Sequence, residues 1–251
     1  TAGARLLHLR SWPRGRRQPG TAMQSLARHP FFKDVAGFDF DKFDRRVIWK
    51  KCDDGETIVD FEDKSTDVYF LLSGDVRVLL RTAAGKEVIL ADIKAGEFFG
   101  EMSAIDGIER SANVTALTKA EVAIMTSGVF REILFSNQHA CDKVMRLLTH
   151  RVRDVNTRLA EMAIFDLRHR LYSELLRSSH ARPGHPGERV VTPPPFHHVV
   201  AARIGCRREQ VTRELSTMAH EGLIEKTRGA LVLLKPQVLE ARLHEAMREG
   251  D

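Results

Sequence analysis

The chain has 251 residues, 43% of them hydrophobic, so it can bury the core of one or two domains without the help of metals or disulfides. Cys52, Cys141 and Cys206 lie far apart and form no CxxC pair, which argues against a zinc or iron–sulfur motif and favours a reducing, cytoplasmic compartment. No apolar run approaches the roughly 20 residues of a membrane span, so we expect no membrane partner.

The net charge of +5 is unevenly distributed along the chain. Residues 1–22 hold five arginines and no acidic residue, without helical or strand periodicity, and we expect a disordered or non-native extension; a basic arm that touches DNA is the alternative. Residues 23–166 carry 20 Lys and Arg against 24 Asp and Glu, whereas residues 167–251 carry 14 against 10. The basic excess in the C-terminal part suits a nucleic-acid partner.

Two strand-like runs, residues 67–80 and 87–93, lead into the segment FGEMSAIDGIERSA at residues 99–112. Within this segment, Gly100 allows a tight turn, and the short helical turn that begins at Glu101 leaves N–H groups free to face an anion. The order of a strand, a turn and a short helix is therefore typical of a ligand-binding segment.

The side chains of this segment have complementary chemistry. Arg110 can direct two N–H donors onto a phosphate, Ser111 adds a hydroxyl donor, and Glu101 can accept a hydrogen bond from a ribose hydroxyl. The alternative is a structural salt bridge between Glu101 and Arg110, with no ligand.

The segment resembles the phosphate-binding cassette of cyclic-nucleotide-binding domains, whose Gly, Glu, Arg and hydroxyl residue are all present. The run at residues 68–78 resembles the central hairpin of that domain, and the resemblance covers about residues 24–135. It implies a β-roll over residues 23–136 that binds cyclic AMP, with cyclic GMP as a second ligand. The ligand contacts that it implies in this segment are Phe99, Gly100, Glu101, Met102, Arg110 and Ser111.

From Ser136 the pattern becomes helical, with Ser136 and Asn137 as a predicted N-cap. Apolar residues then recur at steps of three and four over about seven turns: Val144, Leu148, Val152, Val155, Leu159 and Met162. This stripe packs either on the chain's own β-roll or on the same helix of a second subunit. In the family of cyclic AMP receptor proteins the equivalent helix joins two subunits, so the resemblance implies a homodimer.

Three residues of this helix are further candidates for ligand contact. Arg151 is placed to reach Glu101, and Val155-Asn156-Thr157 replaces the Thr-Ser pair that recognises adenine in the family. Because Asn156 and Thr157 can each donate and accept, they are candidates for reading the purine of cyclic AMP or cyclic GMP. Pairing of Asn156 with its twin across a coiled coil is the alternative.

Residues 165–166 are predicted to form a hinge, followed by a helix over residues 167–176. A helical pair follows, residues 196–204 and 207–221, with Gly205 at the turn between them. In the second helix the predicted core residues are Val211, Leu215 and Met218, while Glu209 and Arg213 lie on the opposite face, where an ordinary i,i+4 ion pair is the alternative to a functional role.

The segment at residues 205–213 resembles the helix-turn-helix of the catabolite activator branch, in which an Arg-Glu-x-x-x-Arg trio reads a TGTGA-like half-site. Arg can bind guanine O6 and N7, and Glu can accept from cytosine N4. Residues 221–224 and 227–233 resemble the helix end and the β-wing, and Arg207 stands where relatives often have a capping Ser, so we expect a weaker cap there. The predicted DNA contacts are His197, His198, Arg207, Arg208, Glu209, Thr212 and Arg213.

The chain therefore resembles regulators of the CRP/FNR superfamily, cyclic AMP receptor branch. The resemblance implies an α+β protein with an N-terminal cyclic-nucleotide-binding β-roll (23–136), a long dimerisation helix and hinge (137–166), and a C-terminal winged helix-turn-helix (167–251). Double-stranded DNA, a second copy of the chain and RNA polymerase are the implied partners. A cyclic-nucleotide hydrolase would need a metal cluster or a paired general base, and the sequence shows neither, so we do not expect an enzyme. The alternative function is a regulator of this type that responds to another small effector.

Overall fold

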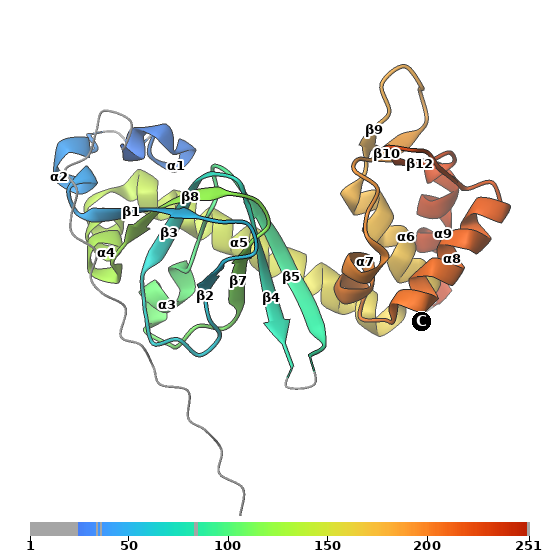
Figure 1. Ribbon diagram of the computed structural model, residues 1–251, viewed down its shortest axis with the longest axis horizontal. Helices are drawn as coiled ribbons and strands as arrows, with labels where there is room; N and C mark the ends of the chain where they lie inside the picture. Colours follow the sequence, from blue (N-terminus) through green and yellow to red (C-terminus); the bar gives the residue numbers. More distant parts are fainter. Residues whose placement is uncertain (1–24, 34, 36, 83–84, 250–251) are drawn as a thin grey trace, which may run out of the picture.

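A computed structural model describes residues 25–33, 35, 37–82 and 85–249, which form an N-terminal domain, a long helix and a C-terminal domain (Figure 1). The expected extension over residues 1–22 lies outside the described residues, as does Met23. The combination of helices with antiparallel sheets confirms the predicted α+β class.

The N-terminal domain is built on two four-stranded sheets, with strand orders β1-β8-β3-β6 and β2-β7-β4-β5. Their strands are β1 (Val47–Cys52), β2 (Thr57–Val59), β3 (Val68–Ser73), β4 (Asp75–Arg81), β5 (Glu87–Lys94), β6 (Phe98–Phe99), β7 (Asn113–Ala116) and β8 (Ala120–Met125). The predicted strand runs correspond to β3, β4 and β5. Gly74 divides β3 from β4 at φ +82°, where an added Cβ would lie 2.5 Å from the Lys119 carbonyl oxygen.

Short helices cover one end of this domain and share an aromatic core with the first sheet. They are a 3₁₀ helix (Leu26–Arg28), α1 (Pro30–Lys33), α2 (Phe40–Asp44) and α4 (Ser127–Ser136), while α3 (Glu101–Asp106) follows β6. Phe32, Phe70, Phe98 and Phe130 are all buried in this core. Burial of one such side chain contributes about 1.5–3 kcal/mol, so this cluster fixes the helices against the sheet that carries β3 and β6.

The prediction that helix begins at Ser136 is wrong for the segment before it. Residues 127–136 already form α4, whose Val129, Phe130 and Ile133 are buried. A short apolar run of this kind does not distinguish a buried helix from a buried strand by periodicity alone. Only its packing against the aromatic core decides the matter.

The long helix is α5 (Gln138–Ile164), and Asn137 caps it as predicted, because its side chain accepts a hydrogen bond from the Ala140 N–H at 3.1 Å. Figure 1 shows α5 passing from the N-terminal domain into the C-terminal domain. The helix ends before Phe165, and the Asp166 side chain caps the next helix, so the two helices are separated at the residues predicted to form a hinge. Val144, at the start of the apolar stripe, is buried, and Leu148 is half-buried against the same core, whereas Val152, Val155, Leu159 and Met162 are exposed.

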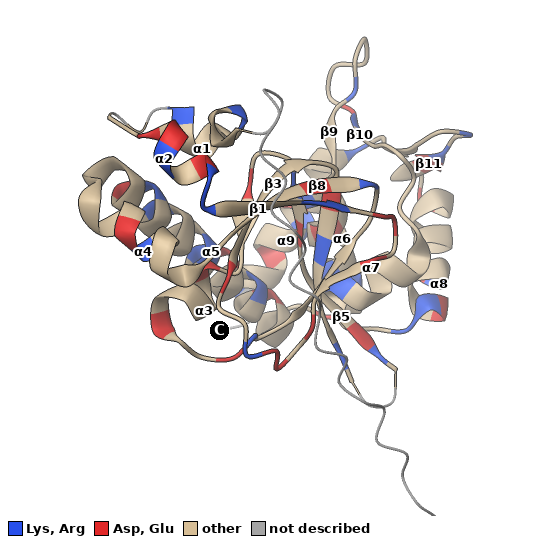
Figure 2. Ribbon diagram, turned by 60° about the vertical axis from the view of Figure 1, so that its left-hand side comes forward, with Lys and Arg blue, Asp and Glu red and all other residues tan. Residues whose placement is uncertain are grey.

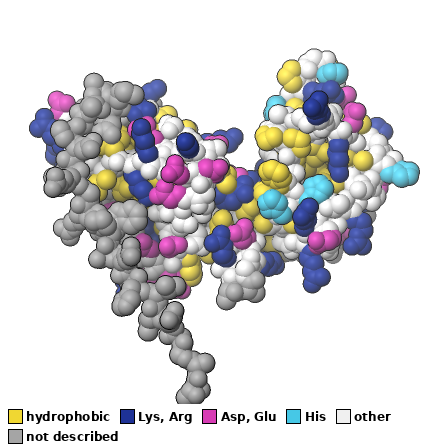
Figure 3. Space-filling model, in the orientation of Figure 1, with side chains coloured by type: hydrophobic (Ala, Val, Ile, Leu, Met, Phe, Trp, Pro, Cys, Tyr) yellow, Lys and Arg dark blue, Asp and Glu magenta, His cyan; other side chains and the backbone are white. Residues whose placement is uncertain are grey.

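The C-terminal domain combines helices with a small antiparallel sheet of strand order β11-β12-β10-β9. Its elements are α6 (Leu167–Ser178), β9 (His180–Ala181), β10 (Arg189–Val191), α7 (His197–Ile204), α8 (Arg208–His220), β11 (Ile224–Lys226), β12 (Leu231–Leu233) and α9 (Pro236–Glu249). The predicted helical pair and wing correspond to α7, α8 and the β11–β12 hairpin. Strands β9 and β10 and helix α9 were not predicted. The two domains form separate lobes (Figure 3).

Candidate functional site

The segment after β6 turns sharply at Gly100 into α3, as predicted. Gly100 has φ +85°, a left-handed conformation that side chains disfavour. A Cβ at this position would lie 2.7 Å from the Asp67 carbonyl oxygen and 2.8 Å from Arg110 Nη1. The absence of a side chain therefore lets β3, the turn and Arg110 approach one another closely.

Glu101 is a buried carboxylate that is hydrogen-bonded to a residue of the long helix α5. Its side chain is 1% exposed, and Oε1 accepts a short hydrogen bond from Arg151 Nη1 of α5, as predicted. Arg151 also donates to the Phe98 carbonyl oxygen at 3.0 Å. The second carboxylate oxygen of Glu101, Oε2, is buried and has no hydrogen-bond partner. A buried charged oxygen without a donor costs free energy, so this atom is suited to accept a hydrogen bond from a ligand.

Arg110 is likewise buried, but its guanidinium has several protein partners. Nε and Nη2 both donate to Ser65 Oγ, at 3.3 and 3.1 Å, Nη2 also donates to the Asp67 carbonyl oxygen at 2.7 Å, and Nη1 donates to the Gly100 carbonyl oxygen at 3.1 Å. The guanidinium also lies over the Tyr69 ring, 5.6 Å from its centroid. Because Glu101 pairs with Arg151 and Arg110 bonds other groups, the alternative of a Glu101–Arg110 salt bridge is wrong.

The side chains around Arg110 are shielded from solvent, since Tyr69 is buried and Asp67 is half-buried. Burial raises the pKa of the Asp67 carboxyl, although the Arg110 charge partly opposes that effect. Burial also raises the pKa of the Tyr69 hydroxyl. Charged groups interact more strongly in such surroundings than in water, so the buried Arg110 guanidinium is suited to an anion.

Ser65, Asp67 and Tyr69 were not predicted as site residues. Asp67 contributes its backbone carbonyl oxygen to the site, and a pattern of side chains in the sequence gives no information about such a contact. Ser65 belongs to a loop that pairs with the Arg110 backbone: Glu62 N–H donates to the Arg110 carbonyl at 3.0 Å, and Arg110 N–H donates to the Asp63 carbonyl at 3.1 Å. This pairing joins residues more than 40 positions apart, and local sequence gives no signal for it.

The remaining predicted ligand contacts differ in their surroundings. Phe99 is buried and its ring stacks on that of Tyr69, with centroids 5.0 Å apart. Met102 is 52% exposed, and Ser111 is exposed. On α5, Asn156 and Thr157 are exposed, one turn beyond Arg151.

The second region of interest is the exposed face of α8. Val211, Leu215 and Met218 are buried, which confirms the predicted core face. Helix α7 ends at Ile204, and the C-cap Gly205, with a φ of +72°, turns the chain toward α8. The exposed residues of α8 and its N-cap include Arg207, Arg208, Glu209, Thr212 and Arg213, and basic segments are visible on α8 in Figure 2.

Glu209 and Arg213 do not form the i,i+4 ion pair considered as an alternative, since neither makes a salt bridge within the described ranges. Arg207 is the N-cap, and its N–H donates to Gln210 Oε1 at 3.0 Å. The Arg207 guanidinium cannot accept from the first N–H groups of α8, as the missing Ser predicts, but the Gln210 side chain satisfies the N–H of the N-cap residue itself. The side chains of Arg207, Arg208, Glu209 and Arg213 are left available to an external partner.

The two histidines at the start of α7 also differ. His197 Nδ1 lies 2.7 Å from Thr212 Oγ1, so it links α7 to α8, and burial and the nearby charges of Lys226 and Arg208 lower its pKa. His198 is exposed, and its ring stacks on Phe196 with centroids 5.6 Å apart. Figure 3 shows several Lys and Arg side chains along the lower edge of the right-hand lobe, which is the C-terminal domain.

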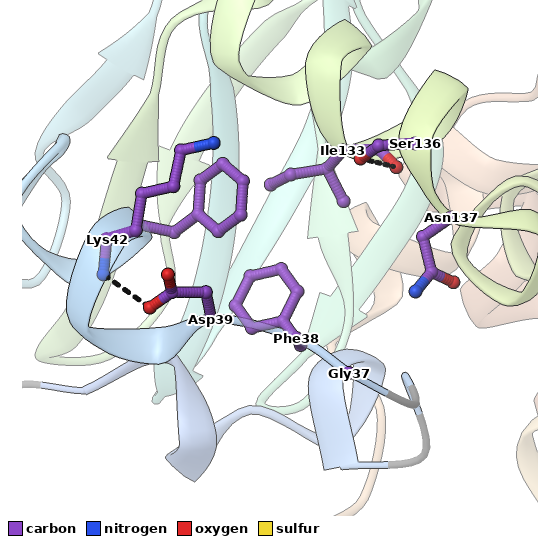
Figure 4. Close-up of a pocket in the computed structure, with 8 residues that line it drawn as sticks. Gly37, Phe38, Asp39, Lys42, Ile133, Ser136 and Asn137 are labelled. Carbon is purple, nitrogen blue, oxygen red and sulfur yellow. Dashed lines mark hydrogen bonds between the residues drawn. The ribbon is translucent and has the colours of Figure 1, made fainter.

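A separate pocket of about 250 Å³ lies where α2 meets the end of α4 (Figure 4). Its polar groups already have partners: Asp39 accepts from the Lys42 N–H at 2.9 Å, and the Lys42 ammonium pairs with Glu132 at 2.7 Å. None of the predicted ligand contacts lines it. Among the described residues, no group of three or more His, Cys, Asp or Glu could hold a metal ion, and no helix has the length and apolar character needed to span a membrane.

Comparison with known proteins identifies both domains. Residues 49–137 match the model of the cyclic nucleotide-binding domain, and residues 169–242 match the Crp-like helix-turn-helix domain. The chain belongs to the CRP/FNR superfamily. It is a CRP-like DNA-binding transcription regulator with a cyclic nucleotide-binding domain, and its relatives and domains are those of regulators, not of enzymes.

Relatives support the assignment to the CRP/FNR superfamily over most of this chain. The CRP-like cAMP-activated global transcriptional regulator of Mycobacterium tuberculosis is 26% identical over 189 residues, which is 75% of this chain and 84% of the relative. A CooA mutant structure from Carboxydothermus hydrogenoformans has a TM-score of 0.72 at 16% identity and covers 85% of this chain and 95% of its own. The c-di-GMP responsive regulator CLP of Xanthomonas campestris has a TM-score of 0.63 at 22% identity and covers 77% and 96%. The last two likenesses concern the fold alone.

Proposed function

We propose that this CRP/FNR protein is a cytoplasmic homodimer in which cyclic AMP promotes binding to a palindromic, TGTGA-like DNA site, with cyclic GMP as a second ligand. The observation that carries the proposal is the buried Oε2 of Glu101, which lacks a hydrogen-bond donor, in the same segment as the buried Arg110 guanidinium. A ribose hydroxyl would supply the missing donor, and a cyclic phosphate would neutralise the buried cation.

The proposed pocket divides the nucleotide among separate groups. Glu101 accepts from the ribose, Arg110 and Ser111 donate to the phosphate, and the base extends toward Asn156 and Thr157 on α5. Because Arg151 joins Glu101 to α5, the ribose contact is linked directly to the long helix. Nucleotide binding therefore stabilises one placement of the roll on α5.

The DNA-binding half of the proposal rests on α5 and α8. Pairing of α5 with its copy covers the exposed stripe and sets two α8 helices about 34 Å apart, one turn of DNA. Arg208 and Arg213 then read guanines, Glu209 reads a cytosine, and Arg207, Thr212, His197 and His198 contact the backbone. Nucleotide and DNA are coupled ligands, so each tightens the binding of the other. RNA polymerase is the proposed protein partner on the promoter.

The direct test is calorimetric titration of the full chain with cyclic AMP, cyclic GMP and c-di-GMP. We expect cyclic AMP to bind, and we expect Arg110→Ala to weaken that binding by about 1.5–3 kcal/mol, the value of a charged hydrogen bond. Arg46→Ala, which removes an arginine paired with Glu132 at the edge of the same domain, is the matched control. Unchanged affinity in Arg110→Ala would contradict the pocket, and heat from c-di-GMP alone would favour a regulator of the other effector class.

Base selection is tested with Asn156→Ala. If Asn156 reads the purine, the substitution changes the ratio of the affinities for cyclic AMP and cyclic GMP, because its amide contacts the two bases through different groups. Titration of both nucleotides into the wild type and the variant measures this ratio. An unaltered ratio would show that Asn156 does not contact the base.

A further inference from the structure

The Arg110 guanidinium has few N–H groups left for a phosphate. Of its five N–H donors, two point to Ser65 Oγ, one to the Asp67 carbonyl oxygen and one to the Gly100 carbonyl oxygen. Both edges of the planar fork are therefore engaged. A bidentate contact to a phosphate requires that one edge be released first.

Ser65 is the partner that can be released at the lowest cost. The Asp67 carbonyl belongs to the backbone directly before β3, and the Gly100 carbonyl belongs to the turn before α3. Neither carbonyl can move unless the backbone of these elements moves. The Ser65 hydroxyl, which also bonds the Tyr69 hydroxyl, can leave Arg110 by a rotation about its χ1 bond without any movement of the backbone. Meanwhile the backbone bonds that join Arg110 to Glu62 and Asp63 keep the loop in place.

We propose that the Ser65 hydroxyl occupies the phosphate-binding edge of Arg110 and that the phosphate of the nucleotide displaces it. Two N–H groups on the same edge, Nε and Nη2, converge on the single hydroxyl oxygen, as they would on one phosphate oxygen. A charged phosphate oxygen is the stronger acceptor, so the exchange is favourable overall, but Ser65 lowers the apparent affinity by competing for Arg110. Ser65 thus sets the nucleotide concentration to which the protein responds. This inference rests on the proposed function.

The proposal predicts that removal of a polar contact tightens binding. Ser65→Ala should bind cyclic AMP about three- to tenfold more tightly than the wild type, with a faster association rate and an unchanged dissociation rate, because Ser65 holds Arg110 only before the exchange. Without nucleotide, the same variant should unfold at a lower urea concentration, since Arg110 loses two hydrogen bonds. Both the rates, from stopped-flow fluorescence, and the urea midpoint are measured on the full chain.

Two variants keep the result interpretable. Ser65→Thr retains the hydroxyl and should bind like the wild type, even if Ser65→Ala folds poorly. Thr66→Val removes the neighbouring hydroxyl, which bonds Ser127 Oγ at 2.9 Å instead of Arg110, and should leave the affinity unchanged. Weaker or equal binding by Ser65→Ala, while the wild type binds, would overturn the displacement and make Ser65 a positioning residue or a bystander. Absence of cyclic-nucleotide binding in every variant would instead overturn the proposed function together with this inference.

Discussion

His29 is a buried neutral histidine that joins the N-terminal helices to the roll. Its side chain is fully buried, Nε2 lies 3.0 Å from the Glu97 carbonyl oxygen, and Nδ1 accepts from the Phe31 N–H at 3.2 Å. This pattern fixes one neutral tautomer, in which Nε2 carries the proton. Burial lowers the pKa of His29, the bond to the Glu97 carbonyl partly opposes that shift, and the Lys143 charge adds to it.

This histidine predicts a pH dependence of stability. Below the ordinary histidine pKa of about 6.5, His29 binds a proton in the unfolded chain but stays neutral in the folded protein. The contribution of His29 to the free energy of unfolding is therefore complete above that pH and declines as the pH falls toward the lowered pKa of the folded state. The free energy of unfolding should decrease by at most about 1.4 kcal/mol per pH unit in this window. Urea unfolding between pH 7.5 and 5 measures it. His29→Gln should lose this component, whereas His244→Gln, at an exposed position of α9, should keep it; equal slopes in all three proteins would contradict the assignment.

At the scale of the element, α5 has two different halves. Ala140 and Val144 are buried, whereas Val152, Val155, Leu159 and Met162 are 59%, 62%, 65% and 51% exposed. The second half of the helix thus presents four large apolar side chains on one stripe, each more than half exposed among the described residues. The helix therefore packs on its own domain at the start and presents an apolar seam beyond it.

This seam predicts the oligomeric state. We expect the wild type to sediment as a dimer and Leu159→Glu to sediment as a monomer, because a buried carboxylate in a coiled-coil seam lacks a partner. At 100° of rotation per residue, Arg153 lies on the side of α5 away from the stripe, so the Arg153→Glu variant should remain dimeric. A dimeric Leu159→Glu in analytical ultracentrifugation would exclude this seam as the interface.

Helix α8 predicts two kinds of effect on DNA binding. Arg208→Ala or Arg213→Ala should cost about 1–3 kcal/mol on a specific palindrome and relax the preference for the guanine that each reads. Arg207→Ala should instead weaken binding to all sequences and reduce the salt slope by about 1, as expected for a phosphate contact. Fluorescence anisotropy with specific and scrambled duplexes separates the two effects. Retained base preference in Arg208→Ala would rule out base reading by this residue.

At the scale of the molecule, an ionic network joins the two domains. Arg203 of α7 bonds Asp92 of β5 in the N-terminal domain and Glu174 of α6 at 2.8 Å, and Arg77 of β4 holds Asp92 through two bonds of 2.7 and 2.9 Å. Burial alone would raise the pKa of Asp92, but the bonds from Arg77 and the charge of Arg203 outweigh it and hold the pKa low. The network thus connects the β4–β5 hairpin directly to the helix that precedes α8.

If this contact carries part of the coupling between nucleotide and DNA, Asp92→Asn should reduce it. We expect the ratio of DNA affinities with and without saturating cyclic AMP to fall by about three- to tenfold, because α7 loses its charged contact with the roll. Glu87→Gln removes an exposed ion pair with Arg81 on the same hairpin and should leave the ratio unchanged. A ratio equal to that of the wild type in Asp92→Asn would show that the network is only structural.

The sequence by itself determined the strand runs and the helical pair of residues 196–204 and 207–221, because each depends on local periodicity or a turn residue, while the fold class and the helix-turn-helix assignment came from the family resemblance of compact motifs. Asn137 and Asp166 cap their helices through bonds to N–H groups three residues away, and Gly100 and Gly205 adopt left-handed conformations at turns. The contact of Arg151 with Glu101 was predicted from the place of Arg151 on the long helix that follows the β-roll. Apart from that contact, these features involve short sequence separations or a known motif.

Only the tertiary structure decided which polar groups have partners. The engagement of Arg110 by Ser65, the unpaired Oε2 of Glu101 and the contact of Arg203 with Asp92 each join segments about 45 to 110 residues apart, or depend on what such segments leave uncovered. A side chain's type states which bonds it can make, but the choice among those bonds is settled by which distant segments pack against it. Helix α4 shows the same principle for secondary structure, since its apolar run fits a strand or a helix until the aromatic core selects the helix.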